Sequence, residues 1–228
     1  MSIIPIYLLD PIFTNAPATI AIIAITAITS FQAFYNYGLK EKLIFNPYSI
    51  KKRYEWYRFW THGLIHADGL HLALNLFVLF GFGEFVEMNF KSNEIFGSLG
   101  TFYYLLLYIL GLSASSLYDY FKYRNNWTYN ALGASGAVSA VLFAAILLEP
   151  TKILLLYGFI PTPAVIGGGL YLVYSYYMAR RGVDNIGHDA HFWGAIWGIV
   201  FTAALDYRLL FKFWNSITEF GFWGWGPN

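Results

Sequence analysis

Residues 133–148 read GASGAVSAVLFAAILL, a run of small and apolar residues without a charge. The run lies in a charge-free stretch between Arg124 and Glu149, which is long enough for a helix of about 20 residues to cross a bilayer. A helix that is apolar on all sides is buried either in a large protein core or in a membrane. The segment therefore predicts a membrane-embedded helix.

Similar stretches lie on both sides of this segment, between Asp10 and Lys40, Asp68 and Glu84, Glu94 and Asp119, Lys152 and Arg180, and Asp189 and Asp206. We predict six spanning helices, over residues 17–38, 69–87, 95–117, 133–149, 153–179 and 188–206. The fifth contains two prolines and a Gly-Gly-Gly run, so it is expected to be broken or kinked. No repeat or low-complexity linker interrupts the pattern. Residues 1–228 are therefore predicted to be one all-α, polytopic membrane domain.

The composition supports this class and excludes others. The chain is 57% hydrophobic and only 12% charged, with a mean hydropathy of +0.48, whereas soluble domains are about a quarter charged. A net charge of +1, with the basic residues scattered, offers no footprint for nucleic acid. Without cysteine there is no disulfide framework, no thiol nucleophile and no cysteine-based zinc site. No H-E-x-x-H motif is present either, so we expect no metal and no cofactor.

The first loop, residues 39–68, mixes basic and aromatic residues and is predicted to lie in the lipid headgroup region. Its six Lys and Arg residues also influence the predicted orientation. The loops after the first, third and fifth spans hold ten basic residues against four on the opposite side. By the positive-inside rule these three loops would face the cytoplasm.

Polar groups inside the spans are the candidates for function, because a charged residue at mid-helix costs about 2.5 to 3.5 kcal/mol on insertion scales. The first group is Gly133-Ala134-Ser135-Gly136, with Ser139 one turn later. Small residues allow another backbone to approach and leave the Ser135 hydroxyl unobstructed. A plain helix-packing contact is the more common meaning of such a pattern.

The second group runs from Asp189 to Gly198. Spacings of three and seven place His191, Gly194 and Gly198 on one helical face, so two small-residue faces each begin with a polar residue, Ser135 and His191. Serine is a weak nucleophile unless a base takes its proton, and histidine is the usual base. The sequence spacing predicts that Asp189 points elsewhere, and His188 is expected to be solvated or to cap the helix. A dyad is therefore predicted rather than a triad.

The third group is His71 and Asn75, an i, i+4 pair on one helical face. Both side chains are neutral hydrogen-bond donors. Together with the Ser135 backbone N–H they are candidates to stabilise the oxyanion of a tetrahedral intermediate. The alternative is an interhelical hydrogen bond that holds the bundle together.

These groups, in this order and spacing, resemble the rhomboid family of intramembrane serine proteases. The resemblance extends from about Tyr57 to Gly198. It includes Tyr57-Arg58, Thr61-His62-Gly63-Leu64-Ile65-His66, His71 and Asn75 as H-x-x-x-N, Glu87, Ser135 in G-x-S-G, Ile160-Pro161-x-Pro163, and Ala190-His191-x-x-Gly194-x-x-x-Gly198. The family implies a six-helix rhomboid-like bundle with an interfacial first loop.

The resemblance also implies a role for each matching residue. Ser135 would be the nucleophile, His191 the general base and then acid, and His71, Asn75 and the Ser135 amide the oxyanion stabilisers. Structural support would come from Arg58, Glu87, Gly133, Gly136, Gly194 and Gly198. The sequence departs from the family twice. Tyr57-Arg58 replaces the common Trp-Arg, and Ser139 stands where the family often has an aromatic residue beneath the histidine.

The function so implied is cleavage of membrane-anchored proteins in or near their transmembrane segment, through an acyl-enzyme, by a multi-pass protein of a bacterial inner membrane. The family topology has cytoplasmic termini and an active site that opens outward, opposite to the orientation indicated by the loop charges. Two other classes are open. One is a proteolytically inactive rhomboid-like protein that binds membrane clients, and relatives of that kind usually lack the serine or the histidine. The other is a small transporter or channel, which predicts polar groups through the bilayer midplane.

Overall fold

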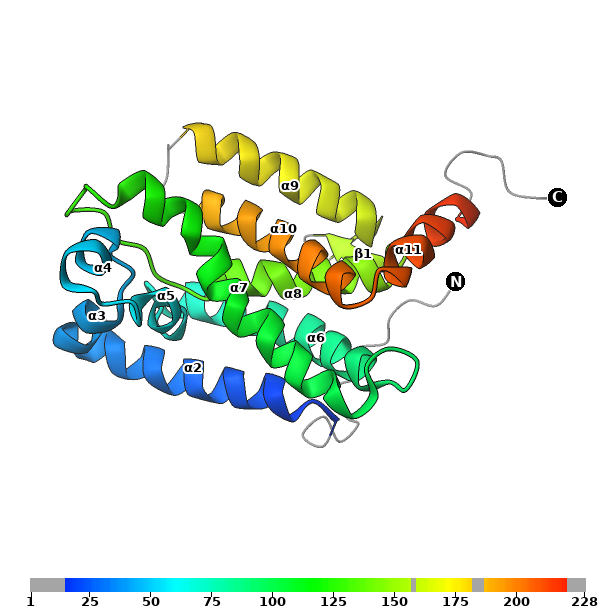
Figure 1. Cartoon of the computed structure of the whole chain (residues 1–228), viewed down its shortest axis with the longest axis horizontal. Coiled ribbons are helices and arrows are strands. Elements are labelled where there is room, and N and C mark those ends of the chain that lie inside the picture. The colour runs from blue at the N-terminus through cyan, green and yellow to red at the C-terminus, as the bar shows by residue number, and fades with distance from the viewer. Residues whose placement is uncertain (1–14, 157–158, 182–186, 221–228) are drawn as a thin grey trace.

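The computed structural model describes residues 15–156, 159–181 and 187–220. The long helices are α2 (Pro17–Tyr35), α6 (Gly69–Lys91), α7 (Gly100–Tyr123), α8 (Ser135–Leu148), α9 (Ala164–Arg181), α10 (His188–Leu205) and α11 (Arg208–Glu219). Shorter helices are α3 (Tyr37–Leu43), α4 (Pro47–Arg53), α5 (Arg58–Thr61), η1 (His62–Leu64) and η2 (Gly97–Leu99). Two strands, β1 (Ile153–Leu156) and β2 (Ile160–Pro163), complete the described part of the chain (Figure 1).

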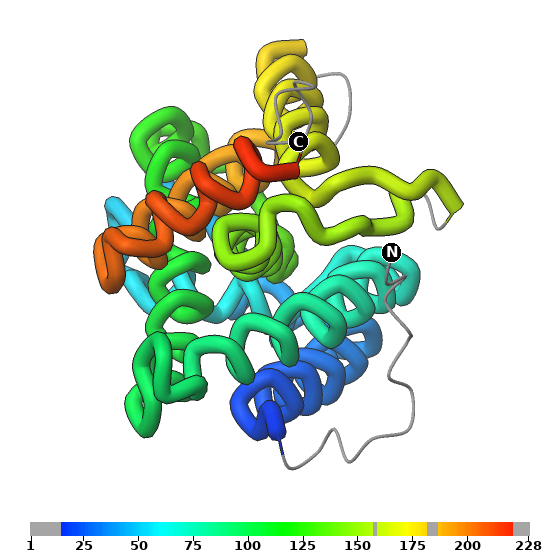
Figure 2. Tube along the Cα trace, turned by 90° about the vertical axis from the view of Figure 1, so that its right-hand side faces the viewer, coloured from blue at the N-terminus to red at the C-terminus, as the bar shows by residue number. Residues whose placement is uncertain are grey.

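Helix α8 lies at the centre of the bundle. It contacts α6, α7, α9, α10 and α11, and Figure 2 looks along it with the other helices around it. Apart from Ser135, Leu142 and Leu148, all of its residues are buried. Alanine favours the helix, and the small side chains let neighbouring backbones approach closely. Pro150 follows the helix and prevents its continuation.

Helices occupy all six positions at which spans are predicted. Among the described residues, three are long and apolar enough to cross a membrane: α2, α6 and the helical run Gly97–Tyr123. A fourth is added if α10 and α11, which meet at 114°, count as one bent span. Helix α8 is apolar but shorter. The chain is a mostly helical, multi-pass membrane protein, and the number of six spans stays a prediction.

The predicted fifth span, residues 153–179, is broken as expected, but its first part is not helical. Residues 153–163 form an antiparallel hairpin, in which Ile153 pairs with Pro163 and Leu156 with Ile160. The helix begins only at Ala164. Proline disfavours the α conformation of the residue before it and has no N–H for a helical hydrogen bond, so Pro161 and Pro163 keep this segment extended.

The first loop is folded into the short helices α3, α4, α5 and η1. Arg58 is buried at its centre, where Nη1 donates to the carbonyl oxygens of Glu41 and Ile44 at 2.8 and 2.7 Å. Its Nε forms an ion pair with Glu55 at 2.6 Å. Arg58 therefore joins the last turn of α3 to the start of α5.

Glu87, near the C-terminal end of α6, connects this helix to the N-terminal parts of α2 and α7. It is fully buried and accepts hydrogen bonds from the backbone N–H groups of Ala18 and Thr19 at 3.1 and 2.8 Å. These amides lie in the first turn of α2 and have no partner within their own helix. The Thr19 hydroxyl lies 2.9 Å both from Glu87 and from the Tyr104 hydroxyl. A carboxylate at a helix N-terminus is favourable, and here it joins three helices.

Candidate active site

Ser135 is the first residue of α8, and the first loop holds the backbone that precedes it. The N–H of Gly133 donates to the carbonyl oxygen of His62 at 3.0 Å, and the N–H of Ala134 donates to Nε2 of His66 at 3.3 Å. Gly133 has a φ of +113°, a conformation that a side chain would strain. The start of α8 therefore depends both on a glycine and on two histidines.

Both histidines are buried and neutral. Because Nε2 of His66 accepts the Ala134 hydrogen bond, the ring proton resides on Nδ1, which donates to Ser30 Oγ at 2.9 Å. Burial lowers the pKa of His66 to about 3 and the pKa of His62 to about 4. A charged form at either position would have to be desolvated. The hydrogen bond from Ala134 requires an uncharged His66 ring, because it is accepted by Nε2, whereas the hydrogen bond from Gly133 is accepted by the backbone carbonyl of His62.

His71 lies directly beside this backbone. A Cβ placed on Gly133 would come within 2.8 Å of Cε1 and 3.1 Å of Nε2 of the His71 ring. Asn75 is buried one turn further along α6, and its Nδ2 donates to the His71 carbonyl oxygen at 2.9 Å. The structure thus places His71 beside Gly133, which precedes Ser135 by two residues in the chain. Asn75 lies one helical turn after His71 on α6.

Helices α8 and α10 pack backbone to backbone along a surface that we call the glycine contact (Gly136, Gly194 and Gly198). A Cβ on Gly194 would overlap the carbonyl oxygen of Gly136, and a Cβ on Gly198 would overlap that of Ala140. A Cβ on Gly136 would overlap Ser115 of α7 and lie 3.4 Å from the Ala190 carbonyl oxygen. Only glycine permits this approach. Gly136 and Ala190 are the sequence neighbours of Ser135 and His191, so the glycine contact brings those two side chains to one end of the bundle.

The ring of His191 has two aromatic neighbours. Tyr171 of α9 lies parallel to it, with ring centroids 6.1 Å apart and an interplanar angle of 23°. His188 meets it edge-on at 5.9 Å and 80°. His188 is buried and also packs against Tyr174 at 5.6 Å. Of the two roles predicted for it, solvation is therefore wrong, and the N-cap position of α10 is held by Gly187. The Tyr171 hydroxyl in turn lies 2.6 Å from Ser139 Oγ.

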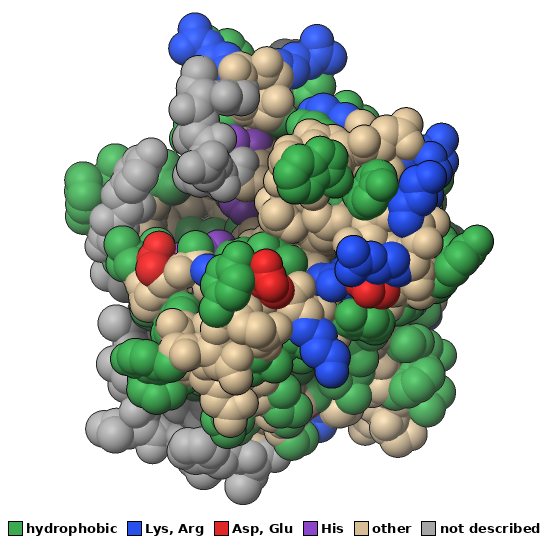
Figure 3. Space-filling view, turned by 90° about the vertical axis from the view of Figure 1, so that its left-hand side faces the viewer, with side chains coloured by type: hydrophobic (Ala, Val, Ile, Leu, Met, Phe, Trp, Pro, Cys, Tyr) green, Lys and Arg blue, Asp and Glu red, His purple; other side chains and the backbone are tan. Residues whose placement is uncertain are grey.

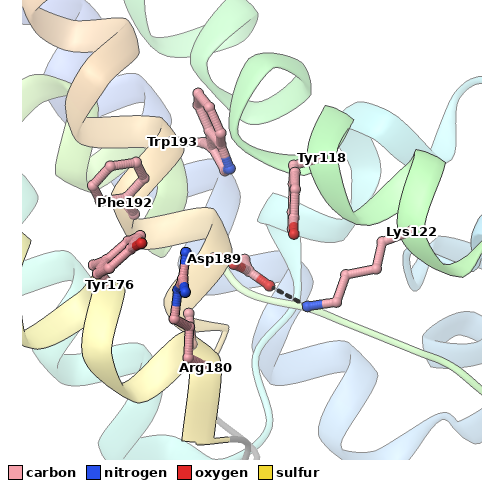
Figure 4. A pocket seen from close by; sticks show the side chains of 8 residues that line it. Tyr118, Lys122, Tyr176, Arg180, Asp189, Phe192 and Trp193 are labelled. Carbon is pink, nitrogen blue, oxygen red and sulfur yellow. Dashed lines mark hydrogen bonds and ion pairs between the residues drawn. The ribbon is translucent and has the colours of Figure 1, made fainter.

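Asp189 points away from His191, as the helical spacing predicts. Its carboxylate forms an ion pair with Lys122 of α7 at 2.8 Å. Figure 4 shows this pair in a cavity of about 570 Å³ between α7, α9 and α10. The rest of it is lined by Tyr118, Tyr176, Ala179, Arg180, Phe192 and Trp193. None of the predicted catalytic residues lines this cavity, so it is separate from the candidate site.

The candidate site is open to one end of the molecule. Ser135, His71 and His191 are each half-buried. Figure 3 views the end at which α3 to α5 lie and shows histidine side chains inside a hollow, with lysine and arginine side chains distributed around it. A half-buried serine and histidine at this end are accessible to water without crossing the bundle.

Sequence reasoning did not identify two groups that contact the candidate site. The motif Thr61–His66 predicts no separate role for His66, and the contact of His66 with Ala134 joins residues far apart in sequence. Tyr171 belongs to none of the sequence motifs. The one available signal for it is the small residue at Ser139, which leaves the space beneath His191 without an aromatic side chain from α8.

In the described part of the chain no three His, Asp or Glu side chains are grouped to hold a metal ion.

Two comparisons with known proteins find similar sequences. A family model described as Rhomboid domain matches residues 53–208. The chain is also similar to RHOMBOID-like protein 12, mitochondrial, of Arabidopsis thaliana, with 30% identity over 141 residues. That alignment covers 59% of this chain and 42% of the relative, so the chain matches less than half the length of that protein. The family match begins at Arg53, within the first loop, and includes the serine helix α8 and the histidine helix α10.

Proposed function

Because the chain belongs to the rhomboid family, we propose that it is an intramembrane serine endopeptidase that cleaves membrane-anchored proteins in or near their transmembrane segments. The observation that carries the proposal is the glycine contact. It sets the backbones of Gly136 and Ala190 against each other, next to a serine and a histidine that are both half-buried at the same end of the bundle.

In the proposed reaction the Ser135 hydroxyl attacks the scissile carbonyl carbon while His191 takes its proton. The carbonyl oxygen becomes an oxyanion, which accepts hydrogen bonds from the Ser135 N–H and from the side chains of His71 and Asn75. The Asn75 amide group carries a second N–H beside the one that it donates to His71. No cofactor takes part.

Collapse of the tetrahedral intermediate breaks the C–N bond, and His191 donates its proton to the leaving amine. The substrate remains attached to Ser135 as an ester. His191 then deprotonates a water molecule that attacks this ester, and a second tetrahedral intermediate releases the new carboxylate and restores the Ser135 hydroxyl. The hollow at this end of the molecule supports the supply of that water.

The substrate backbone must be extended to reach Ser135, because a regular helix keeps its amides hydrogen-bonded. Substrates with small or helix-breaking residues near the membrane surface are therefore favoured. Helix α9 is the element expected to move for access from the bilayer. It has few buried residues, namely Ala164, Gly168 and Ser175. The chain contains no native cysteine, so a bridge between engineered cysteines on α6 and α9 can test this, and unchanged cleavage would contradict it.

We place the protein in a bacterial inner membrane, with its termini in the cytoplasm and the Ser135 end facing outward. The resemblance supports this orientation, and the mixture of basic and aromatic side chains in the first loop is compatible with headgroup binding. A reporter fused after Asn228 tests it directly. A reporter that is active only outside the cytoplasm would reverse the assignment.

The deciding assay uses purified protein in detergent and a fluorescent transmembrane substrate. Ser135→Ala and His191→Ala are each expected to lower the rate by at least about 10³-fold, because both members of a dyad are needed for proton transfer. Ser113→Ala is the matched control. Its hydroxyl donates to the Leu110 carbonyl within α7 at 3.0 Å, so cleavage should be unchanged.

If either dyad variant cuts as well as the wild type, the assigned residues are wrong. If the wild-type protein binds the transmembrane peptide but does not cut it, the protein is instead a client-binding member of the family.

A further inference from the structure

We propose that Tyr171 is the positioning residue for His191, and that Ser139 links it to the helix that carries Ser135. The inference rests on the proposed function and extends it, because it assigns a support for the general base that no sequence motif indicated. The support comes from α9, a different helix from those that carry the serine and the histidine.

The first observation is the ring geometry. The Tyr171 and His191 rings lie 23° from parallel at a centroid distance of 6.1 Å, within the range of offset aromatic stacking. His188 closes a second side of the imidazole at 80°. Stacking on one side and an edge contact on another restrict the rotation of the imidazole ring about its side-chain bonds.

The second observation is the hydrogen bond that fixes Tyr171 itself. Its hydroxyl lies 2.6 Å from Ser139 Oγ. Ser139 is buried, with 3% of its surface exposed, and lies one helical turn after Ser135 on the same face of α8. The ring that supports the base is therefore held at a defined height relative to the nucleophile.

The third observation is that α9 is attached to α8 at few points. Few of its residues are buried. A Cβ added at Gly167 would meet only Thr162, at 3.8 Å, and one added at Gly169 would meet no atom within 4 Å. Gly168 and Tyr171 are exceptions: Gly168 packs against Ile146, and Tyr171 contacts Ser139 and lies 5.8 Å from the ring of Phe143 between centroids. Ser139 is small enough to leave room for a ring from α9. The aromatic side chain that the family often carries at this position of the serine helix is thus replaced by one from a neighbouring helix.

The kinetic test compares Tyr171→Leu with Tyr171→Phe. Loss of the ring is expected to lower kcat by about 10- to 100-fold with little change in KM, because a misplaced base affects the chemical step and not substrate binding. Tyr171→Phe keeps the ring and should recover most of that loss. Tyr177→Leu is the matched control, since Tyr177 lies on the same helix and is 50% exposed. A kcat of Tyr171→Leu within twofold of wild type would overturn the proposal.

A double-mutant cycle tests the link to Ser139. Ser139→Ala and Tyr171→Phe each remove one partner of the same hydrogen bond, so the double variant should be no slower than either single variant. Effects that multiply would show that the two hydroxyl groups act separately and would overturn the link.

A spectroscopic measurement keeps the inference testable if the protein does not cleave. In histidine-labelled wild-type protein, the ring protons of His191, assigned by comparison with His191→Ala, should show an upfield ring-current shift from Tyr171. The shift should persist in Tyr171→Phe and disappear in Tyr171→Leu. Persistence in Tyr171→Leu overturns the inference, whereas inactive wild-type protein with the expected shift refutes only the proposed function.

Discussion

Helices α9 and α10 both pack against the central α8, but they are held in different ways. Helix α10 meets α8 through backbone, because Gly194 and Gly198 leave no space for a side chain against Gly136 and Ala140. Helix α9 meets α8 through side chains, such as the Tyr171 hydroxyl on Ser139. The first arrangement leaves the two backbones no room to shift, whereas the second depends on side-chain contacts. A membrane protease of the proposed kind needs both, a fixed dyad and a movable side for the substrate.

The largest effect is expected from closing the glycine contact. Gly194→Ala places a methyl group against the Gly136 carbonyl, which the backbone cannot avoid without moving α10 and His191. We expect a loss of about 3 kcal/mol or more in stability, and at least a 100-fold loss in cleavage from displacement of the base by about 1 Å. Thermal unfolding in detergent and the cleavage assay measure the two effects.

Gly169→Ala is the matched control on α9. A Cβ there meets no atom within 4 Å, and alanine favours a helix over glycine by up to about 1 kcal/mol. This variant should be as stable as the wild type or more so. Equal losses in Gly194→Ala and Gly169→Ala would mean that the two helices are held in the same way.

The parts of this arrangement that could be predicted from sequence are those set by local helix geometry. The spacing of His191, Gly194 and Gly198 places them on one face of any helix, and charge-free length locates the apolar segments. The rhomboid membership expected from the motifs is confirmed by the family match over residues 53–208. The roles of Ser135 and His191 remain predictions.

The parts that could not be predicted depend on contacts between distant segments. Neither the packing of Tyr171 on His191 nor the contact of His66 with Ala134 has a local pattern. The hairpin at 153–163 was missed for a different reason. Its residues are as apolar as those of a span, and apolar composition alone does not separate strand from helix, although Pro161 and Pro163 marked a break.

The next largest expected effect is a fall in stability at low pH, caused by the two buried histidines that contact the backbone before α8. The buried rings of His62 and His66 have pKa values of about 4 and about 3, below their ordinary value of 6.5. Below pH 6.5 the unfolded chain binds protons that the folded chain does not, so stability should fall as pH drops. We expect a loss of about 2 kcal/mol for each ring between pH 7 and pH 5, measured by thermal unfolding at each pH.

His66→Gln tests the assignment of this pH dependence. Glutamine retains a donor and an acceptor but does not titrate. The variant should be less stable at pH 7 and should lose less stability on going to pH 5. If the wild type unfolds at the same temperature at both pH values, burial does not lower the pKa values of His62 and His66. Such a result would weaken the view that the α8 side of the molecule is the rigid one.

The smallest expected effect is a difference in local opening between α9 and its neighbours. Helices with few buried contacts open more readily than those in the core. Amides in the middle of α9 should therefore exchange with a lower opening free energy than those of α8 and α10, by about 1 to 2 kcal/mol. Hydrogen exchange with mass spectrometry in detergent measures this helix by helix.

Comparison with α10 is the informative control for exchange, because both helices lie outside α8 and only α10 has the backbone contact. Gly169→Ala should reduce the difference by stiffening α9, and Tyr171→Leu should enlarge it by removing the bond to Ser139. If α9 exchanges as slowly as α10 in the wild type, its few buried residues do not make it the movable side, and substrate access would have to involve another helix. If Tyr171→Leu alone frees α9, the same side chain both supports the base and holds the helix in place, so opening of α9 would withdraw that support until the helix returns.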